Sequence, residues 1–172
     1  AITNRIGLVK EIRKDEGLFL LSSVRTNTVM VAMEKILRFK LFLDFNKERS
    51  VAEEYVHMLK TATPSVNQPV MFLSGGNQQK VVLAKWLFSD SRIVILDEPT
   101  RGIDVGAKRE IYEIINKLAA DGKVIIVVSS EMEEIMGISD RIVVMHEGRI
   151  AGEVDREHFS QSLITEYAVG GA

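Results

Sequence analysis

Two apolar runs on either side of an amphipathic helix constrain the fold of this 172-residue chain more than any other feature. The runs are RIVILDEPT (92–100) and KVIIVVSS (123–130), and each is typical of a buried parallel strand. The segment between them carries isoleucine and leucine on one helical face and stops at Gly122. A strand, a helix and a second strand in this order predict a parallel sheet with a right-handed crossover. The expected fold class is therefore α/β.

The segments before and after these two runs differ in their sequence pattern. Residues up to about Asp90 are mostly helical in pattern, and the segment 49–61 has a clear apolar stripe. After the second run, helical segments flank an alternating stretch that contains a Glu-Gly turn signal. We expect helices over 27–43, 49–61, 130–139 and 156–168, a short strand over 6–9, and a hairpin that turns at Glu147 and Gly148.

The overall composition excludes several classes of protein. Hydrophobic residues make up 46% and charged residues 27%, which suits one globular domain or a domain with a lobe. The formal net charge of −2 gives no strong attraction to nucleic acid. The absence of cysteine excludes disulfides and cysteine-based metal sites, and it fits a reducing compartment. No apolar run is long enough to span a bilayer, and the first residues, AITNRIGLVKEIRK, lack the apolar core of a secretory signal.

The first candidate site lies where the first apolar run ends, at Asp97 and Glu98. Ligands of open parallel sheets bind beyond the carboxyl ends of the strands. An aspartate there can hold Mg²⁺ directly or through water, as Walker B aspartates do, and a neighbouring glutamate can polarise an attacking water. The two acids can equally cap the turn that Pro99 enforces. The pattern alone leaves both interpretations open.

The second candidate site is the stretch SGGNQQK, residues 74–80. Ser74 can cap the helix that follows, and Gly75 and Gly76 allow a ligand to approach the backbone closely. The unpaired N–H groups and the dipole of the helix then favour an anion. An ordinary capped helix would look the same if the stretch stood alone. The second candidate site precedes the first in the chain, with one helix between them. In this arrangement the two sites together favour phosphate chemistry.

These segments resemble the motifs of ATP-binding cassette (ABC) ATPases, and the resemblance runs from about Met71 to the end of the chain. Their variants look most like the second cassette of the fused, two-cassette ATPases that energise bacterial importers of ribose- and galactose-type monosaccharides. LSGGNQQK (73–80) resembles the signature motif, VILDEPT (94–100) the Walker B strand with the catalytic Glu, RGID (101–104) the D-loop, VVSSE (127–131) the switch-histidine loop and SDRIVVMHEGRI (139–150) the C-terminal hairpin.

The resemblance implies a partial P-loop NTPase fold: a parallel sheet flanked by helices, a helical lobe with the signature motif, and a C-terminal β-hairpin. The Q-loop region would be 1–20, the helical lobe 21–90, and the part of the catalytic sheet with Walker B, D-loop and switch loop 91–172. Glu11 falls at the Q-loop position. The sugar group's Glu-Asp-Arg-Lys run reads Glu11-Ile12-Arg13-Lys14 here, so its second position departs.

No G-x-x-x-x-G-K-[ST] phosphate loop occurs in the sequence, so we expect Ala1 to lie downstream of it. Cassettes of the family work as head-to-tail pairs, with ATP and Mg²⁺ bound between the P-loop of one cassette and the signature motif of the other. The resemblance therefore implies that this chain contributes residues to the binding sites of two different nucleotides. The nucleotide of the partner cassette would be contacted by Ser74, Gly75, Gly76 and Gln78. The chain's own nucleotide would be served by Asp97 as the Mg²⁺ ligand, Glu98 as the catalytic group, Ser130 and Glu11. The dimer seam would contain Asp104.

Ser130 stands where the family usually has a histidine. A hydroxyl can form a hydrogen bond with a phosphate oxygen, but it cannot carry the charge of an imidazole or reach as far. We therefore expect slow or no hydrolysis at the chain's own site, despite Glu98. The site completed by the intact signature motif is expected to be competent.

The function implied is ATP hydrolysis coupled to monosaccharide import by the full-length protein, with this chain alone inactive. The implied partners are a second cassette fused N-terminally, membrane permease subunits and, indirectly, a sugar-binding protein, but no nucleic acid. The implied location is the cytoplasmic side of the membrane, as a peripheral protein. Two alternatives stay open: a non-catalytic module that completes a partner's ATP site, and an ABC ATPase that acts on DNA or ribosomes, whose usual coiled-coil, zinc or basic insertions are missing here.

Overall fold

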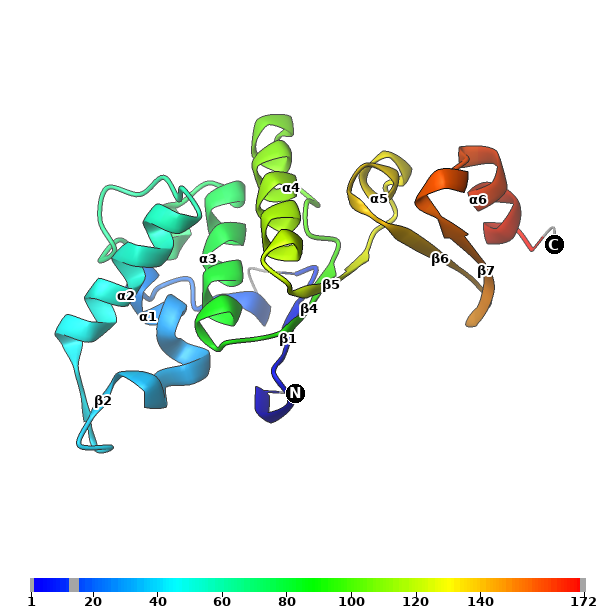
Figure 1. Cartoon of the computed structure of the whole chain (residues 1–172). Helices are drawn as coiled ribbons and strands as arrows, with labels where there is room; N and C mark the ends of the chain where they lie inside the picture. Colours follow the sequence, from blue (N-terminus) through cyan, green and yellow to red (C-terminus); the bar gives the residue numbers. More distant parts are fainter. Residues whose placement is uncertain (1, 13–15, 171–172) are drawn as a thin grey trace. The chain divides into compact units, whose positions relative to one another are not determined.

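The computed structural model describes residues 2–12 and 16–170, which form two compact units, 1–128 and 129–172 (Figure 1). Each unit has its own core. Arg13 and Lys14 of the expected Q-loop run lie outside the described residues. Within the described part of the chain, no helix is both long and apolar enough to cross a membrane.

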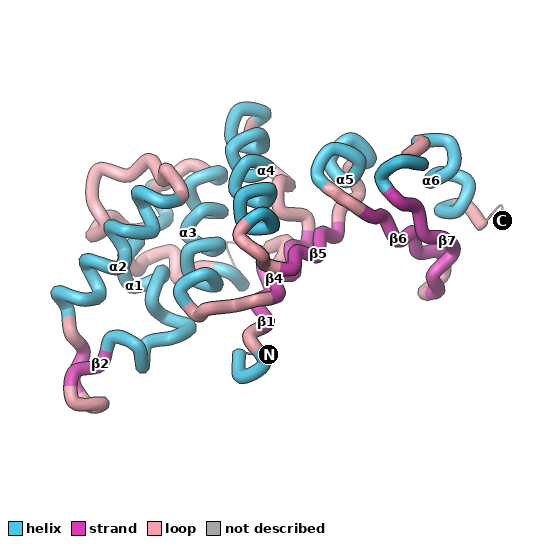
Figure 2. Tube along the Cα trace, in the orientation of Figure 1, coloured by secondary structure: helices cyan, strands magenta, loops and turns pink. Residues whose placement is uncertain are grey.

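A three-stranded parallel sheet is the centre of the first unit. Its strands are β1 (Ile6–Val9), β4 (Ile93–Asp97) and β5 (Val124–Val128), in the order β1-β4-β5 (Figure 2). The register aligns Val9 with Leu96 and Leu96 with Val127. Helix α4 (Val105–Ala120) is the crossover between β4 and β5, and the chain turns back into β5 through Gly122, which has a φ of +84°. The predicted strand–helix–strand unit and the short first strand are both confirmed.

Only one face of this sheet is covered by helices in the described residues. Helix α3 (Gly75–Phe88) packs on β1 and α4 packs on β5. A Cβ on Gly7 would lie 3.1 Å from the Trp86 ring, so glycine allows α3 to approach β1 closely. On the opposite face, Leu8, Val124, Ile126 and Val128 are 38–55% exposed. The prediction that 123–130 forms a buried strand was therefore wrong for this face of β5.

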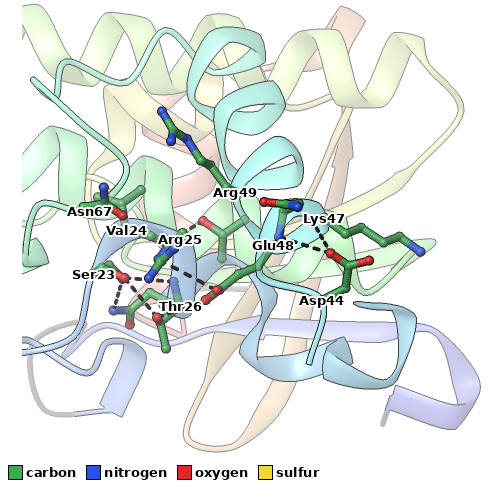
Figure 3. Close-up of polar contacts among 12 residues, drawn as sticks. Ser23, Val24, Arg25, Thr26, Asp44, Lys47, Glu48, Arg49 and Asn67 are labelled. Atoms are coloured by element: carbon green, nitrogen blue, oxygen red, sulfur yellow. Dashed lines mark hydrogen bonds and ion pairs between the residues drawn. The ribbon is translucent and has the colours of Figure 1, made fainter. Parts of the chain in front are cut away.

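Helices α1 (Val24–Val29) and α2 (Phe45–Met58) pack with α3 into a helical lobe. Between α1 and α2 lies a buried carboxylate, Glu48, which accepts a hydrogen bond of 3.1 Å from Thr26 Oγ1 and lies 3.7 Å from Arg25 Nε (Figure 3). The 3-10 helix η4 (Val70–Phe72) leads into α3, and η1 (Ile2–Asn4) precedes β1. The apolar core of the lobe comprises Val29, Ala32, Ile36 and Phe88, with Leu43, Val51 and Tyr55 packed against it.

The prediction of one helix over 27–43 was wrong. Helix α1 ends at Val29, and the 3-10 helix η3 (Met30–Ile36) that follows is kinked at Ala32, where φ is −134°. The chain then forms an antiparallel hairpin from β2 (Leu37–Arg38) and β3 (Phe42–Leu43). This stretch is rich in apolar and β-branched residues, which suit strands as well as helices, so periodicity could not separate the two.

The second unit pairs β6 (Arg141–His146) with β7 (Arg149–Asp155) in a hairpin. The predicted turn is confirmed, because Glu147 and Gly148 adopt φ values of +45° and +75°. Helices α5 (Met132–Ile138) and α6 (Gln161–Ala168) pack with the hairpin around Ile142, Val144, Val154 and Ile164. The expected last helix, 156–168, is interrupted: the 3-10 helix η5 (Arg156–His158) ends before extended backbone at Ser160, where φ is −140°.

Candidate functional site

The glycine-containing turn at the start of α3 is held by its own side chains. Ser74 is the N-cap, and its Oγ accepts hydrogen bonds from Asn77 Nδ2 at 2.9 Å and from the Asn77 amide at 3.5 Å. Asn77 Oδ1 in turn accepts from the amide of Ala62 at 2.7 Å. Ser74 is exposed and Gly75 partly exposed. The first amides of a helix have no acceptor within that helix, so this fixed turn presents donors suited to an anion.

Gly76 and Gln78 face the protein interior behind this turn. A Cβ on Gly76 would lie 2.5 Å from Ala107 Cβ, so the turn packs tightly against the first turn of α4. Gln78 is 3% exposed, and its Nε2 donates to the carbonyl of Val70 at 3.1 Å. These residues position the turn from the inside, while Ser74 and Gly75 form its accessible surface.

Replacing Ser74 by alanine is expected to lower the free energy of unfolding by about 1 kcal/mol, because the cap of α3 loses its acceptor. Urea denaturation followed by circular dichroism would measure this. Ser50→Ala is the matched control, because Ser50 is an exposed residue inside α2 and alanine is the better helix former there. Equal stability of the two variants would show that the Ser74 cap contributes nothing.

The carboxyl edge of the sheet brings three acidic residues from distant parts of the sequence to one side. Glu11 follows β1, Asp97 is the last residue of β4 and Glu98 comes next. Arg101 Nη1 donates to Glu11 Oε1, which joins the loop after β4 to the loop after β1. The sequence placed Arg101 only within the stretch that resembles the D-loop. The missed signal was opposite charge in two loops that leave the same edge of a parallel sheet.

Glu98 has an unusual backbone conformation. Its φ is +45°, a region that residues other than glycine seldom adopt, and its amide donates to the carbonyl of Val128 at 2.8 Å. Such positions concentrate at functional sites, where the surrounding structure enforces them. Asp97 alternates with the buried Leu96, so its side chain lies on the open face of the sheet.

The acids at this edge fit a magnesium ion that is bound together with a phosphate ligand. The described residues contain no group of three or more histidines or acids that could hold a metal on its own. Mg²⁺ bound with a nucleotide needs only one or two protein carboxylates, and phosphate oxygens and waters complete its shell. A single half-buried carboxylate at the end of β4, Asp97, meets that requirement.

The two remaining residues assigned by resemblance lie in different units. Asp104 is exposed and caps α4, where its Oδ1 accepts from the amide of Ala107 at 3.0 Å. Its carboxylate therefore has a structural partner, and a role at a dimer seam stays a prediction. Ser130 belongs to the second unit, where it is exposed and lies two residues beyond the end of β5.

Two lysines of α3 were missed by sequence reasoning. Lys80 is 2% exposed, and its Nζ donates to Glu110 Oε2 at 2.9 Å and to the carbonyl of Lys60 at 2.8 Å. Lys85 Nζ donates to the carbonyl of Gly17 at 2.6 Å, and burial lowers the pKa of this ammonium. Both lysines hold in place the helix that carries the turn. Nothing in the sequence signalled this, because lysine normally lies at the surface.

The chain matches a family model described as ABC transporter over residues 2–101. It is 47% identical over 171 residues to a ribose import ATP-binding protein of Geobacillus kaustophilus, covering 99% of this chain and 34% of the relative. It is 50% identical over 170 residues to an arabinose import ATP-binding protein of Burkholderia thailandensis, covering 98% of this chain and 34% of the relative. The chain thus spans about a third of the length of the curated relatives it matches.

Solved structures show the same fold at low sequence identity. A dimeric ATP-binding cassette in a post-hydrolysis state with ADP and Pi superposes with a TM-score of 0.71 and 23% identity, covering 92% of this chain and 66% of the other. At this identity the likeness establishes the arrangement of helices and strands alone.

Proposed function

Because this chain belongs to the ABC transporter family, we propose that it is part of the second nucleotide-binding cassette of an ATPase that energises monosaccharide import. The observation that carries the proposal is a hydrogen-bonded, accessible Ser-Gly turn on α3, followed in the chain by two acids at the carboxyl edge of a parallel sheet. The names of the sugar-import relatives support the coupling to uptake.

In this proposal the chain contributes residues to the binding sites of two nucleotides. The hydroxyl of Ser74 and the amides of Gly75 and Gly76 donate hydrogen bonds to the γ-phosphate of ATP held by a partner cassette. Asp97 holds Mg²⁺ at the chain's own nucleotide, where the ion would neutralise phosphate charge. Glu98 orients the attacking water and accepts its proton.

The two sites are proposed to be unequal, because Ser130 cannot supply the charge of an imidazole at the chain's own site. In the full-length protein, Glu98→Gln is then expected to retain more than about half of the sugar-stimulated ATP turnover. Ser74→Arg, which blocks the turn, is expected to reduce turnover by more than about 100-fold, the usual loss when a transition-state donor is removed. Abolition of turnover by Glu98→Gln alone would refute the asymmetry.

A purely completing role is the second candidate, and Ser130, which stands where the family usually has a histidine, favours it. Calorimetric titration of the folded chain with Mg-ATP tests the shared-site arrangement that both candidates assume. Tight binding would require a nucleotide site independent of a P-loop and would overturn the shared-site proposal. Dependence of turnover on sugar and permease subunits, rather than on DNA or ribosomes, would separate a peripheral transport ATPase from the other branches of the family.

A further inference from the structure

The hairpin formed by β2 and β3 lies at the end of the helical lobe (Figure 1). It exposes large apolar side chains. We call residues 38–42 together with Phe45 the hairpin tip. Its exposed apolar residues are Phe39 (81%), Leu41 (74%), Phe42 (64%) and Phe45 (62%). Single exposed apolar residues are common on proteins, but a contiguous group of this size marks an interaction surface.

The surroundings of the hairpin tip are basic, although the chain as a whole has a net charge of −2. The guanidinium of Arg38 lies 5.4 Å from the centroid of the Phe39 ring, and Lys40 lies next to that ring in sequence. Asp44 is engaged at the start of α2, where its Oδ1 accepts from the amides of Asn46 and Lys47 (Figure 3). Lys35 Nζ donates to the carbonyl of Phe88 and Lys47 Nζ to that of Lys35, so Arg38 and Lys40 are the basic groups at the hairpin tip itself.

Folding alone does not account for the residues in this turn. Phe39 and Lys40 have φ values of +53° and +58°, and the amide of Leu41 donates to the carbonyl of Arg38 at 3.2 Å. Two central residues with positive φ strongly favour Asn-Gly, which adopts this conformation with little strain. A phenylalanine and a lysine occupy it instead, and the phenylalanine is 81% exposed. The strain points to a use for these two side chains outside the fold.

We infer that the hairpin tip contacts the surface of an anionic lipid bilayer. Aromatic and leucine side chains enter the headgroup boundary, while Arg38 and Lys40 remain at the level of the lipid phosphates. The exposed side chains stand on a projecting turn, and a bilayer accepts such a turn without a complementary pocket. An acidic protein partner would have to present a surface shaped to this turn. The contact is independent of ATP and of any permease, so it goes beyond the proposed function.

The first test uses a variant that should fold at least as well as the original chain. Phe39→Asn/Lys40→Gly installs the favoured turn sequence and removes one ring and one charge. Vesicles of phosphatidylcholine with about one third phosphatidylglycerol are the probe. Binding measured by co-sedimentation is expected to weaken more than about tenfold, since each basic residue and each buried apolar group contributes near a surface. The melting temperature is expected to stay equal or rise. Unchanged binding would overturn the inference.

A fluorescent reporter separates insertion at the hairpin tip from general adsorption. Phe39→Trp is expected to shift its emission to the blue on anionic vesicles, but not on pure phosphatidylcholine, and the shift should decline as salt is added. Val105→Trp is the control, because Val105 is 84% exposed at the start of α4. Equal shifts in both variants would show non-specific adsorption and contradict the inference. No shift in either would overturn it and leave a protein as the partner of this surface. Neither result bears on ATP turnover.

Discussion

Replacing Lys80 by alanine is expected to lower the free energy of unfolding of the first unit by about 3 kcal/mol. The side chain is 2% exposed, so truncation removes several buried methylene groups, each worth about 0.8 kcal/mol. It also leaves the carbonyl of Lys60 without its donor, a loss of about 1 kcal/mol. The ion pair with Glu110 adds little, because the Glu110 side chain is 56% exposed and solvent screens it. Urea unfolding curves would give the difference.

Two further variants divide this loss into its parts. Lys80→Met keeps most of the buried volume and removes only the donors, so we expect a loss of about 1 kcal/mol. Lys117→Ala removes an exposed lysine from α4 and should change stability by less than about 0.5 kcal/mol. If Lys80→Ala is no more destabilising than Lys117→Ala, the packing of α3 on α4 around Lys80 is not as described.

Substituting alanine for Gly76 is expected to reduce stability by about 1–3 kcal/mol and ATP turnover of the full-length protein by about 100-fold. The new Cβ would lie 2.5 Å from Ala107 Cβ, closer than two methyl groups can pack, so α3 and α4 must separate. Because Ser74 and Gly75 are fixed to the same helix, the separation displaces the proposed phosphate donors. A displacement of this kind commonly reduces catalysis about 100-fold.

A second substitution on the facing helix tests the cause. Gly76→Ala/Ala107→Gly removes the opposing methyl group, and it should restore stability to within about 1 kcal/mol, the usual penalty of a helical glycine. Gly106→Ala is the control in the same part of α4, because its nearest contact would be an ordinary 3.4 Å from Asp104 Oδ1. Failure of the double variant to recover stability would show that contact with Ala107 is not what makes glycine necessary.

The elements that followed from the sequence were those with a distinct period or a distinct turn. Strand β4, helix α4 and the turn at Glu147 and Gly148 carry such signals, and so does the serine cap of α3. The region 27–43 carries none, because its apolar and β-branched residues suit either element. The positive φ values of Phe39 and Lys40 oppose residue preference, so local sequence could not reveal the hairpin.

The residues of the candidate site also differ in how far the sequence predicts them. The acids at the end of β4 follow from the rule that ligands bind at the carboxyl edge of a parallel sheet. The contact between Arg101 and Glu11 joins residues 90 positions apart, and it needed the strand order before it could be seen. The burial of Lys80 depends on how α3 and α4 pack, which periodicity does not specify, because lysine normally lies at the surface.

Strand β5 is apolar on both of its faces, and this has a consequence for its alignment with β4. A slip of one residue would exchange Ile125 and Val127 for Ile126 and Val128 without any change in hydrophobicity, so side-chain pattern alone does not set the alignment. Contacts at the two ends of the strand do: Lys123 Nζ donates to the carbonyl of Ser91, and the Glu98 amide to that of Val128. A slip would move the point where the chain leaves the sheet by about 3.3 Å. The backbone amide of Glu98, rather than its carboxylate, thus keeps the strand aligned, and inserting a single residue into β5 is expected to break this contact.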